Sequence, residues 1–298
     1  MQLYHHPYSL DSQKVRLALE EKNIDYTSFH VNPITGKNFD SNFFRMNPSA
    51  KLPVFQNGSH ILYDTIEIIQ YIERIAVVSS GGDNPTLSSR EVVEWMHKIE
   101  QWNPKFFTLF HLPVKYRLSV SAFLRRVIIA RMAESPKLAS AYHRKLREAY
   151  ETEDKMQDVE VLRRSEDHLE RILNEAESKL GETTYLVGDE FTLADVMFIP
   201  ILSRLVLLNL EEKYISTRPN MAEYWNMVQQ RPSYKKRAEE LAAFLSDVGG
   251  DGGCPAFVGA VTDAMVEATV VVKCDGCPAE VGLFTPFQQS FFNLFFRD

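Results

Sequence analysis

The sequence predicts an α/β domain followed by an all-helical domain. Residues 2–75 alternate short apolar runs with helix-like segments, whereas apolar side chains recur at helical spacing from about residue 91 to residue 245. Between these regions, Ser, Gly, Asn and Pro cluster and interrupt both patterns. We therefore expect an α/β domain at 1–76, a linker at 77–90 and an all-α domain at 91–245.

The elements of the first domain follow from local signals. A strand at 3–5 precedes an amphipathic helix, for which Asp11 or Ser12 is the expected N-cap. A second strand is expected at 26–31. Asn57-Gly58 separates two apolar runs, which predicts a hairpin because Asn-Gly tolerates positive φ angles. A helix face follows, with isoleucine at every third position: Ile66, Ile69, Ile72 and Ile75.

The resulting order, βαβαββα, is typical of a thioredoxin-like domain.

The amino-acid composition excludes some classes of function. The 298 residues include 40 acidic and 33 basic side chains, a formal net charge of −7. A general nucleic-acid binder would need an excess of Lys and Arg, so that class is disfavoured and no nucleic-acid partner is expected. No secretory leader and no run of 18 apolar residues is present, so a cytoplasmic location is expected.

Three places in the first domain combine a structural and a chemical interpretation. Pro53 precedes a strand and is either an ordinary trans proline or a cis one. Asp64-Thr65 lies where the helix begins, so it either caps the helix or holds the ammonium and carboxylate of an amino-acid ligand. Ser9 is either a turn residue or a donor that stabilises a ligand thiolate beside a helix N-terminus.

Four segments together resemble the glutathione S-transferases. They occur in the family's order and spacing over roughly residues 1 to 245: Ser9–Arg16, Asn47–Val54, Leu62–Ile72 and Leu186–Asp195. Within that superfamily the N-terminal half looks most like the plant class related to tetrachlorohydroquinone dehalogenases. The resemblance implies the glutathione S-transferase fold, glutathione as co-substrate, no metal and a homodimer.

The resemblance also implies a role for Ser9. It stands six residues before Val15, the position of the catalytic serine in the serine-type classes, where it would donate a hydrogen bond to the glutathione sulfur. Tyr4 and Tyr8 are rival donors, because some classes use tyrosine, but Ser9 has the better spacing.

The remaining glutathione contacts are implied for loop residues. Leu52 would bind the cysteinyl backbone through its main chain, with Pro53 cis. Asp64 and Thr65 would hold the γ-glutamyl ammonium and carboxylate. The glycyl carboxylate is assigned to two polar residues, Lys51 and Asn38.

The last segment resembles the family's capping box. Thr192 would accept a hydrogen bond from a backbone N–H of the helix that follows, and Asp195 would reach back to the N-cap N–H. In the family this box is a folding element.

Cysteine placement selects among the family's reactions. All three cysteines follow residue 253, at Cys254, Cys274 and Cys277. The dehalogenases use a cysteine in the first turn, so thiol exchange is disfavoured here. We expect transfer of glutathione to a small hydrophobic electrophile, or to a peroxide, in detoxification. The alternatives are a non-catalytic ligand-binding module and a membrane-associated adaptor similar to the ganglioside-induced differentiation-associated proteins.

Three other features leave the interpretation open. Aromatic residues early in the helical domain suit either a core or the electrophile pocket: Trp95, Trp102, Phe106, Phe107, Phe110 and His111. The stretch at 113–158 is longer than in most family members and is a candidate insertion. The tail at 246–298 departs from the family, and its phenylalanines at helical spacing suit a disordered or an amphipathic segment that could contact a membrane surface.

His5 and His6 point to opposite faces of a strand, so no metal is expected there.

Overall fold

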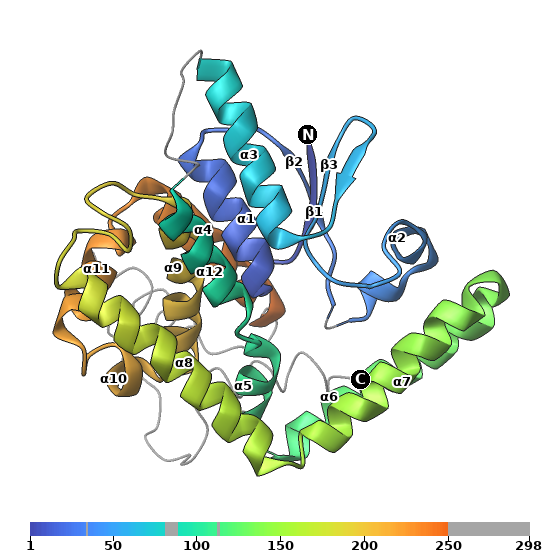
Figure 1. The fold of residues 1–298 in the computed structure, drawn as a ribbon. Helices are drawn as coiled ribbons and strands as arrows, with labels where there is room; N and C mark the ends of the chain where they lie inside the picture. The colour runs from blue at the N-terminus through green and yellow to red at the C-terminus, as the bar shows by residue number, and fades with distance from the viewer. Residues whose placement is uncertain (34, 81–88, 112–113, 250–298) are drawn as a thin grey trace, which may run out of the picture.

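The α/β domain is built on a four-stranded mixed sheet. The computed structural model describes residues 1–33, 35–80, 89–111 and 114–249 (Figure 1). The strands lie in the order β2-β1-β3-β4, with β1 and β2 parallel and the other neighbours antiparallel. Their bounds are Gln2–His5 (β1), Thr27–His30 (β2), Val54–Asn57 (β3) and His60–Leu62 (β4). The helices of this domain are Leu10–Glu21 (α1), Ser41–Met46 (α2) and Thr65–Ser80 (α3), with a 3-10 turn at Lys37–Phe39 (η1).

The first helix begins earlier than predicted. The N-cap of α1 is Ser9, whose Oγ accepts a hydrogen bond from the backbone N–H of Ser12 at 3.3 Å. The expected caps, Asp11 and Ser12, were therefore wrong. Ser12 has a fully buried side chain, and its Oγ accepts from His6 N instead. Three good cap residues lie within four positions, and packing of Ser12 selects the first of them.

Two other boundaries of this domain differ in detail. In the hairpin, Asn57 remains in β3 and Gly58 takes the positive φ of 61°, so Gly58 supplies the turn's left-handed backbone. Helix α3 continues to Ser80, past the predicted start of the linker at 77. The apolar helical pattern extends to that point, and the glycine pair 81–82 follows.

The rest of the described chain is helical, which confirms the predicted fold class. The longer helices are Arg90–Glu100 (α4), Val114–Glu134 (α6), Ala139–Lys155 (α7), Val159–Leu180 (α8), Leu193–Leu207 (α9), Pro219–Gln229 (α11) and Pro232–Gly249 (α12). Shorter helical turns are Pro104–Phe110 (α5), Pro136–Leu138 (η3) and Glu211–Tyr214 (α10).

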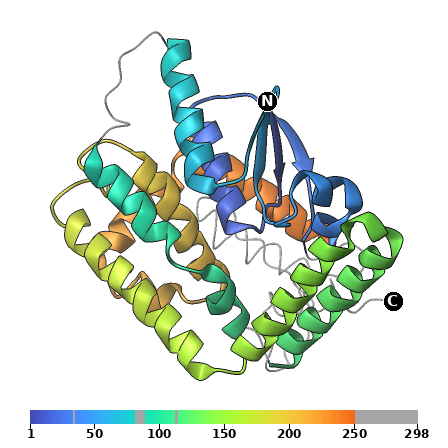
Figure 2. The same ribbon diagram turned by 45° about the vertical axis from the view of Figure 1, so that its right-hand side comes forward.

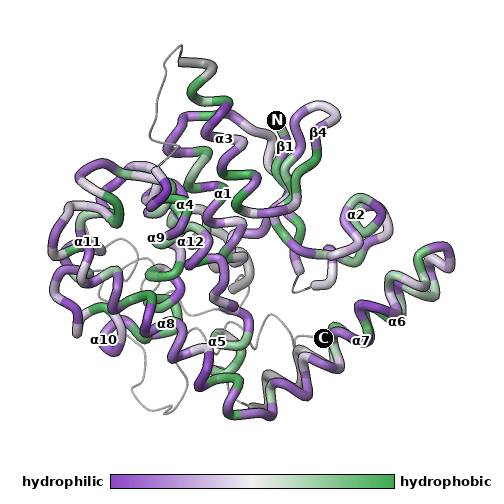
Figure 3. The backbone as a smooth tube through the Cα atoms, in the orientation of Figure 1, coloured by the Kyte–Doolittle hydropathy of each residue, from purple (hydrophilic) through white to green (hydrophobic). Residues whose placement is uncertain are grey.

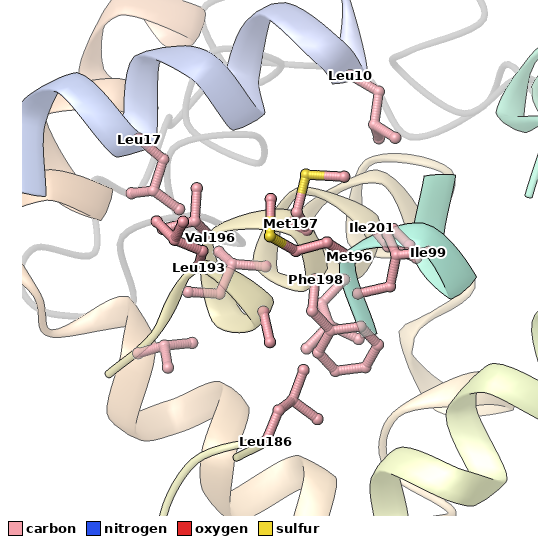
Figure 4. Close-up of a cluster of buried hydrophobic side chains, with 14 of the residues drawn as sticks. Leu10, Leu17, Met96, Ile99, Leu186, Leu193, Val196, Met197, Phe198 and Ile201 are labelled. Carbon is pink, nitrogen blue, oxygen red and sulfur yellow. The ribbon is translucent and has the colours of Figure 1, made fainter. Parts of the chain in front are cut away.

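Helix α9 lies at the centre of the core, and every one of its residues is buried. Figure 4 shows its side chains meeting Leu10 and Leu17 of α1 and Met96 and Ile99 of α4. One core therefore spans both domains, because α1 packs against α3 on one side and against α9 and α12 on the other.

The helix α9 opens with the capping box. Thr192 Oγ1 accepts from Ala194 N at 3.3 Å, and the carboxylate of Asp195 accepts from Thr192 N at 2.8 Å. Asp195 is fully buried and also accepts from Leu186 N and the Tyr224 hydroxyl. Burial raises the pKa of its carboxyl, although these hydrogen bonds oppose the shift. The box thus fixes the loop before α9 as well as the helix end.

Helices α6 and α7 form a hairpin that reaches from the helical domain to the α/β domain (Figures 1 and 2). Hydrophilic and hydrophobic residues alternate along it (Figure 3), and its apolar side chains pack on Phe39, Phe44 and Ala50. Tyr142 of α7 stacks on Phe44 at 4.3 Å, and its hydroxyl donates to the Phe39 carbonyl at 2.7 Å. The predicted insertion at 113–158 therefore lies against η1 and α2.

The predictions for the tail fall outside the described residues, apart from its first positions in α12. Within the part of the chain that the structure describes, none of the helices is both long and apolar enough to cross a membrane.

Candidate functional site

A cavity of about 510 Å³ lies between the two domains, beneath the α6–α7 hairpin. One side, which we call the loop wall, comes from the α/β domain and includes Ser9, Asn38 and Lys51. The other side, the helical wall, comes from α5, α6 and α7 and includes Lys105, Thr108, Leu109, Leu124, Ile128, Lys145, Glu148 and Thr152. The cavity is therefore the place where the first turn of α1 meets the insertion.

Ser9 presents a hydroxyl to this cavity from a helix N-terminus. Its Oγ already accepts from Ser12 N, which leaves its proton for another acceptor. The N-terminus of α1 adds a partial positive charge at the same point. An anion beside Ser9 would thus gain a hydrogen bond and a favourable dipole.

The two tyrosines differ from Ser9 in what they offer. Tyr4 lies in β1, stacks on Phe29 at 4.9 Å and donates to Gln2. Tyr8 lines the cavity with part of its side chain, but its hydroxyl is buried. Burial raises the pKa of Tyr8, although the charge of Arg204 opposes the shift.

Arg204 of α9 holds the turn that carries Ser9. Its guanidinium lies 4.3 Å from the centre of the Tyr8 ring and donates to the Tyr8 carbonyl oxygen. It also donates to Thr108 Oγ1 of α5 at 3.3 Å. The side chain is buried, so this contact fixes the position of the Ser9 turn relative to the helical domain.

Asn38 and Lys51 line the cavity from neighbouring loops. Asn38 is buried and donates to the Ala50 carbonyl at 2.9 Å. Asn47, also buried, donates to the Lys51 carbonyl at 2.8 Å. Lys51 itself is exposed and has no ion pair with any described residue. The two amides thus hold the loop that presents the Lys51 ammonium.

Four other predicted residues do not line the cavity. The Leu52–Pro53 peptide bond is cis, and Leu52 packs against the Val31, Phe43 and Val54 cluster. Asp64 is exposed and its Oδ1 accepts from Glu67 N at 3.0 Å, as an N-cap of α3 would. Thr65 is buried.

An acidic group nevertheless extends from the cavity toward Asp64. Lys14 is buried between Asp11, which lines the cavity, and Glu100, with distances of 2.9 and 2.8 Å. Burial would lower the pKa of Lys14, but the two carboxylates outweigh it and the pKa is raised. Burial raises the pKa of Glu100, with added repulsion from Asp11 and Asp64 and opposition from Lys14. Lys14 is thus shared by two carboxylates, and Asp64 adds a third negative charge near Glu100.

Half of the aromatic stretch belongs to the core, and its other three positions are half-buried. Trp95, Trp102 and Phe107 are buried in the main cluster, and none of the six predicted aromatic positions lines the cavity. Their neighbours in α5, Lys105, Thr108 and Leu109, form the wall instead. In the described parts of the chain, no group of three or more His, Cys, Asp or Glu is placed to hold a metal ion.

Comparison with known proteins identifies the class. A model of the glutathione S-transferase N-terminal domain matches residues 3–80, and a model of the C-terminal domain matches residues 159–224. The chain belongs to the glutathione S-transferase family, which confirms the resemblance in its sequence. The α6–α7 hairpin lies between the two matched segments.

Three known proteins show which members of the family this chain is similar to. The chain is 71% identical to Glutathione S-transferase TCHQD of Arabidopsis thaliana over 236 residues, which cover 79% of this chain and 88% of that protein. It is 26% identical to the tetrachloro-p-hydroquinone reductive dehalogenase of Sphingobium chlorophenolicum, over 78% of this chain and 93% of that protein. Glutathione transferase F2 of Populus trichocarpa shares the fold, with a TM-score of 0.59 at 23% identity, over 81% of this chain and 99% of that structure.

Sequence reasoning did not find Arg204, Asn47 or Lys105. Asn47 lies within a segment that carried the resemblance, but its amide contact with Lys51 is a loop detail. Arg204 meets Tyr8 across 196 positions, so no local spacing could indicate it.

Proposed function

We propose that the chain is a serine-type glutathione transferase in which Ser9 stabilises the glutathione thiolate. One observation carries the proposal: Ser9 caps α1 at the cavity with its Oγ engaged as an acceptor and its proton available. A hydrogen bond to the charged form lowers a thiol pKa, and the helix N-terminus acts in the same direction.

The other groups of glutathione are assigned to the loop wall and to four residues of the α/β domain outside the cavity lining. We assign the glycyl carboxylate to Lys51, whose ammonium has no carboxylate partner among the described residues, with Asn38 holding its loop. We assign the γ-glutamyl group to Asp64 and Thr65 at the start of α3, and the cysteinyl backbone to Leu52 beside Pro53. The carboxylate excess around Lys14 favours an ammonium near Asp64, because a cation there would offset the repulsion.

The reaction then follows from the cavity. The thiolate attacks an electrophilic carbon, a carbon–sulfur bond forms, and the leaving group departs with the bonding electrons. With a peroxide, the thiolate attacks one oxygen, the O–O bond breaks and the alkoxide leaves as an alcohol after it takes up a proton. The resulting glutathione sulfenic acid reacts with a second glutathione to give the disulfide and water. The apolar part of the helical wall, Leu109, Leu124 and Ile128, supports a hydrophobic second substrate.

We also propose that the protein acts as a homodimer, on the resemblance to its family. A cytoplasmic location, and contact of the tail with membranes, stay predictions.

The decisive experiment compares wild type with Ser9→Ala. Conjugation of 1-chloro-2,4-dinitrobenzene and reduction of cumene hydroperoxide are measured beside glutathione binding by calorimetry. Lost turnover with retained binding supports the proposal. Glutathione binding without turnover in the wild type would favour a ligand-binding module.

A further inference from the structure

The charged side chains around the cavity are unevenly paired. Among the described residues that line it, six carry charge: Asp11, Lys51, Lys105, Lys145, Glu148 and Arg204. Asp11 pairs with Lys14, Lys145 pairs with Glu148 at 2.6 Å, and Arg204 is bound to the Tyr8 carbonyl and to Thr108. In the described parts of the chain this leaves Lys51 and Lys105 without a carboxylate at ion-pair distance. The two cations belong to opposite walls.

The ammonium of Lys105 is held in a fixed place. Its Nζ donates to Thr152 Oγ1 of α7 at 3.0 Å. The Thr152 hydroxyl donates in turn to the Glu148 carbonyl at 2.7 Å, so Thr152 can only accept from the lysine. An ammonium has three protons, so two remain for a ligand in the cavity.

The charges near Lys105 are mostly positive, with Glu148 as the one carboxylate that acts on its pKa. Its side chain is exposed and lines the cavity. Burial lowers its pKa, and Lys145, Lys155 and Lys51 lower it further, whereas Glu148 opposes the shift. A ligand anion at this point would offset the repulsion among these lysines and accept a charge-assisted hydrogen bond from Lys105.

We propose that Lys105 binds an acidic group on the second substrate, so that the enzyme prefers electrophiles with a carboxylate or sulfonate on an apolar body. The proposal rests on the proposed transferase function. Phe39, Leu109, Leu124, Ile128 and Met156 supply apolar surface to the same cavity. Lys51 on the loop wall is left for glutathione, so each of the two substrates has one cation.

A matched pair of aryl chlorides tests this preference. The probes are 4-chloro-3,5-dinitrobenzoate and its neutral carboxamide, which have nearly the same shape. In both, the glutathione thiolate displaces chloride from the ring in the same substitution. Each enzymatic rate is divided by the uncatalysed rate with glutathione, which removes the difference in ring activation. Wild type, Lys105→Met, Lys105→Arg and Lys98→Met are compared; Lys98 of α4 lies outside the cavity and pairs with Glu175.

We expect the KM for the benzoate to rise about tenfold or more in Lys105→Met, since a hydrogen bond to a charged group is lost. The KM values for the carboxamide and for glutathione should not change, Lys105→Arg should restore the preference, and Lys98→Met should behave as wild type. Equal handling of both probes by wild type and Lys105→Met would overturn the proposal. A rise in the glutathione KM alone would assign Lys105 to glutathione and would also overturn it.

Binding separates this inference from the transferase function. Calorimetry with the two preformed glutathione conjugates, carboxylate and carboxamide, needs no turnover. Weaker binding of the carboxylate conjugate to Lys105→Met supports the anion site even in a protein that does not catalyse. If wild type and Lys105→Met each bind the carboxylate conjugate and the carboxamide conjugate with the same affinity, the anion site is rejected, whether or not the protein catalyses the reaction.

Discussion

The two walls of the cavity are built in different ways. On the loop wall, the contacts within the α/β domain are short in sequence: Ser9 caps the helix that it precedes, and Asn47 holds Lys51 four positions away. The long-range contact of this wall is that of Arg204 with the turn before Ser9. On the helical wall, Lys105 is placed by Thr152, 47 positions away, and the whole hairpin is placed by Tyr142 on Phe39, 103 positions away. The first wall depends on local backbone geometry, and the second depends on packing between distant segments.

This difference separates what each wall can contribute to function. A cap and a helix N-terminus recur wherever the local sequence recurs, which suits the binding of an invariant co-substrate. Side chains on a packed hairpin change with the hairpin, which suits selection among second substrates. The predictions below test whether the two walls are independent in this sense.

The largest effect is expected on the loop wall, at Ser9. Loss of a hydrogen bond to a charged sulfur should raise the pKa of bound glutathione by roughly one to two units, because such bonds contribute about 1.5–3 kcal/mol. For Ser9→Ala we expect kcat/KM near neutral pH to fall roughly 10- to 100-fold, with the pH profile moved to higher pH. Thiolate absorbance of the bound glutathione against pH measures the shift directly.

A matched variant separates donation from capping. Ser9→Ala also removes the cap, whereas Ser9→Gly retains most of the capping preference at a cost of only a few tenths of a kcal/mol. Both variants should show the same shift in the pH profile, although only Ser9→Ala loses about 1 kcal/mol of stability. A normal profile in Ser9→Gly would move the thiolate donor to another residue, such as Tyr8.

The same difference explains how much the sequence revealed. The strands of the sheet, the hairpin at Gly58 and the capping box at Thr192 all have local signals, and they were predicted. Ser9, Asn38 and Lys51 were also singled out from the sequence and line the cavity, while their roles stay predictions. The cap of α1 was misplaced because Ser9, Asp11 and Ser12 are all good caps locally, and the burial of Ser12 decides between them. Arg204 and Lys105 have no local signal, because an arginine in an apolar helix and a lysine after a proline fit many surroundings.

The second prediction concerns acid and the strand that leads to Ser9. His5, the last residue of β1, and His6, which follows it, are both buried. Burial is the main cause that lowers the pKa of His5 to about 3 and that of His6 to about 4. Tyr8 N donates to His6 Nδ1 at 3.3 Å, so the turn before Ser9 uses the neutral ring. Both folded-state values lie below the usual 6.5, so the stability that these histidines contribute is present above pH 6.5 and is lost as pH falls.

Each histidine should therefore reduce the free energy of unfolding by about 1.4 kcal/mol per pH unit below pH 6.5, or about 2 kcal/mol by pH 5. Urea unfolding at pH 7.5, 6.5, 5.5 and 5 gives the slope. His6→Asn offers an uncharged acceptor to Tyr8 N and should reduce the slope by the share of one histidine. An unchanged slope in that variant would show that His6 does not couple acid to the loop wall.

The smallest effect tests whether the hairpin packs on the loops. Gly36 has a φ of 74°, and a Cβ added there would lie 2.4 Å from Val127 Cγ1 of α6. Gly36→Ala should cost about 1–2 kcal/mol from the left-handed backbone alone, plus the cost of moving Val127. Val127→Ala removes the obstructing methyl groups, so Gly36→Ala should cost less in that background. Urea unfolding of the four proteins in the double-mutant cycle gives the coupling, expected to exceed about 0.5 kcal/mol. A cycle without coupling would mean that the hairpin does not touch Gly36 in solution. The hairpin side chains and Ser9 would then no longer line one cavity, and the substrate preference assigned to the helical wall would lose its structural basis.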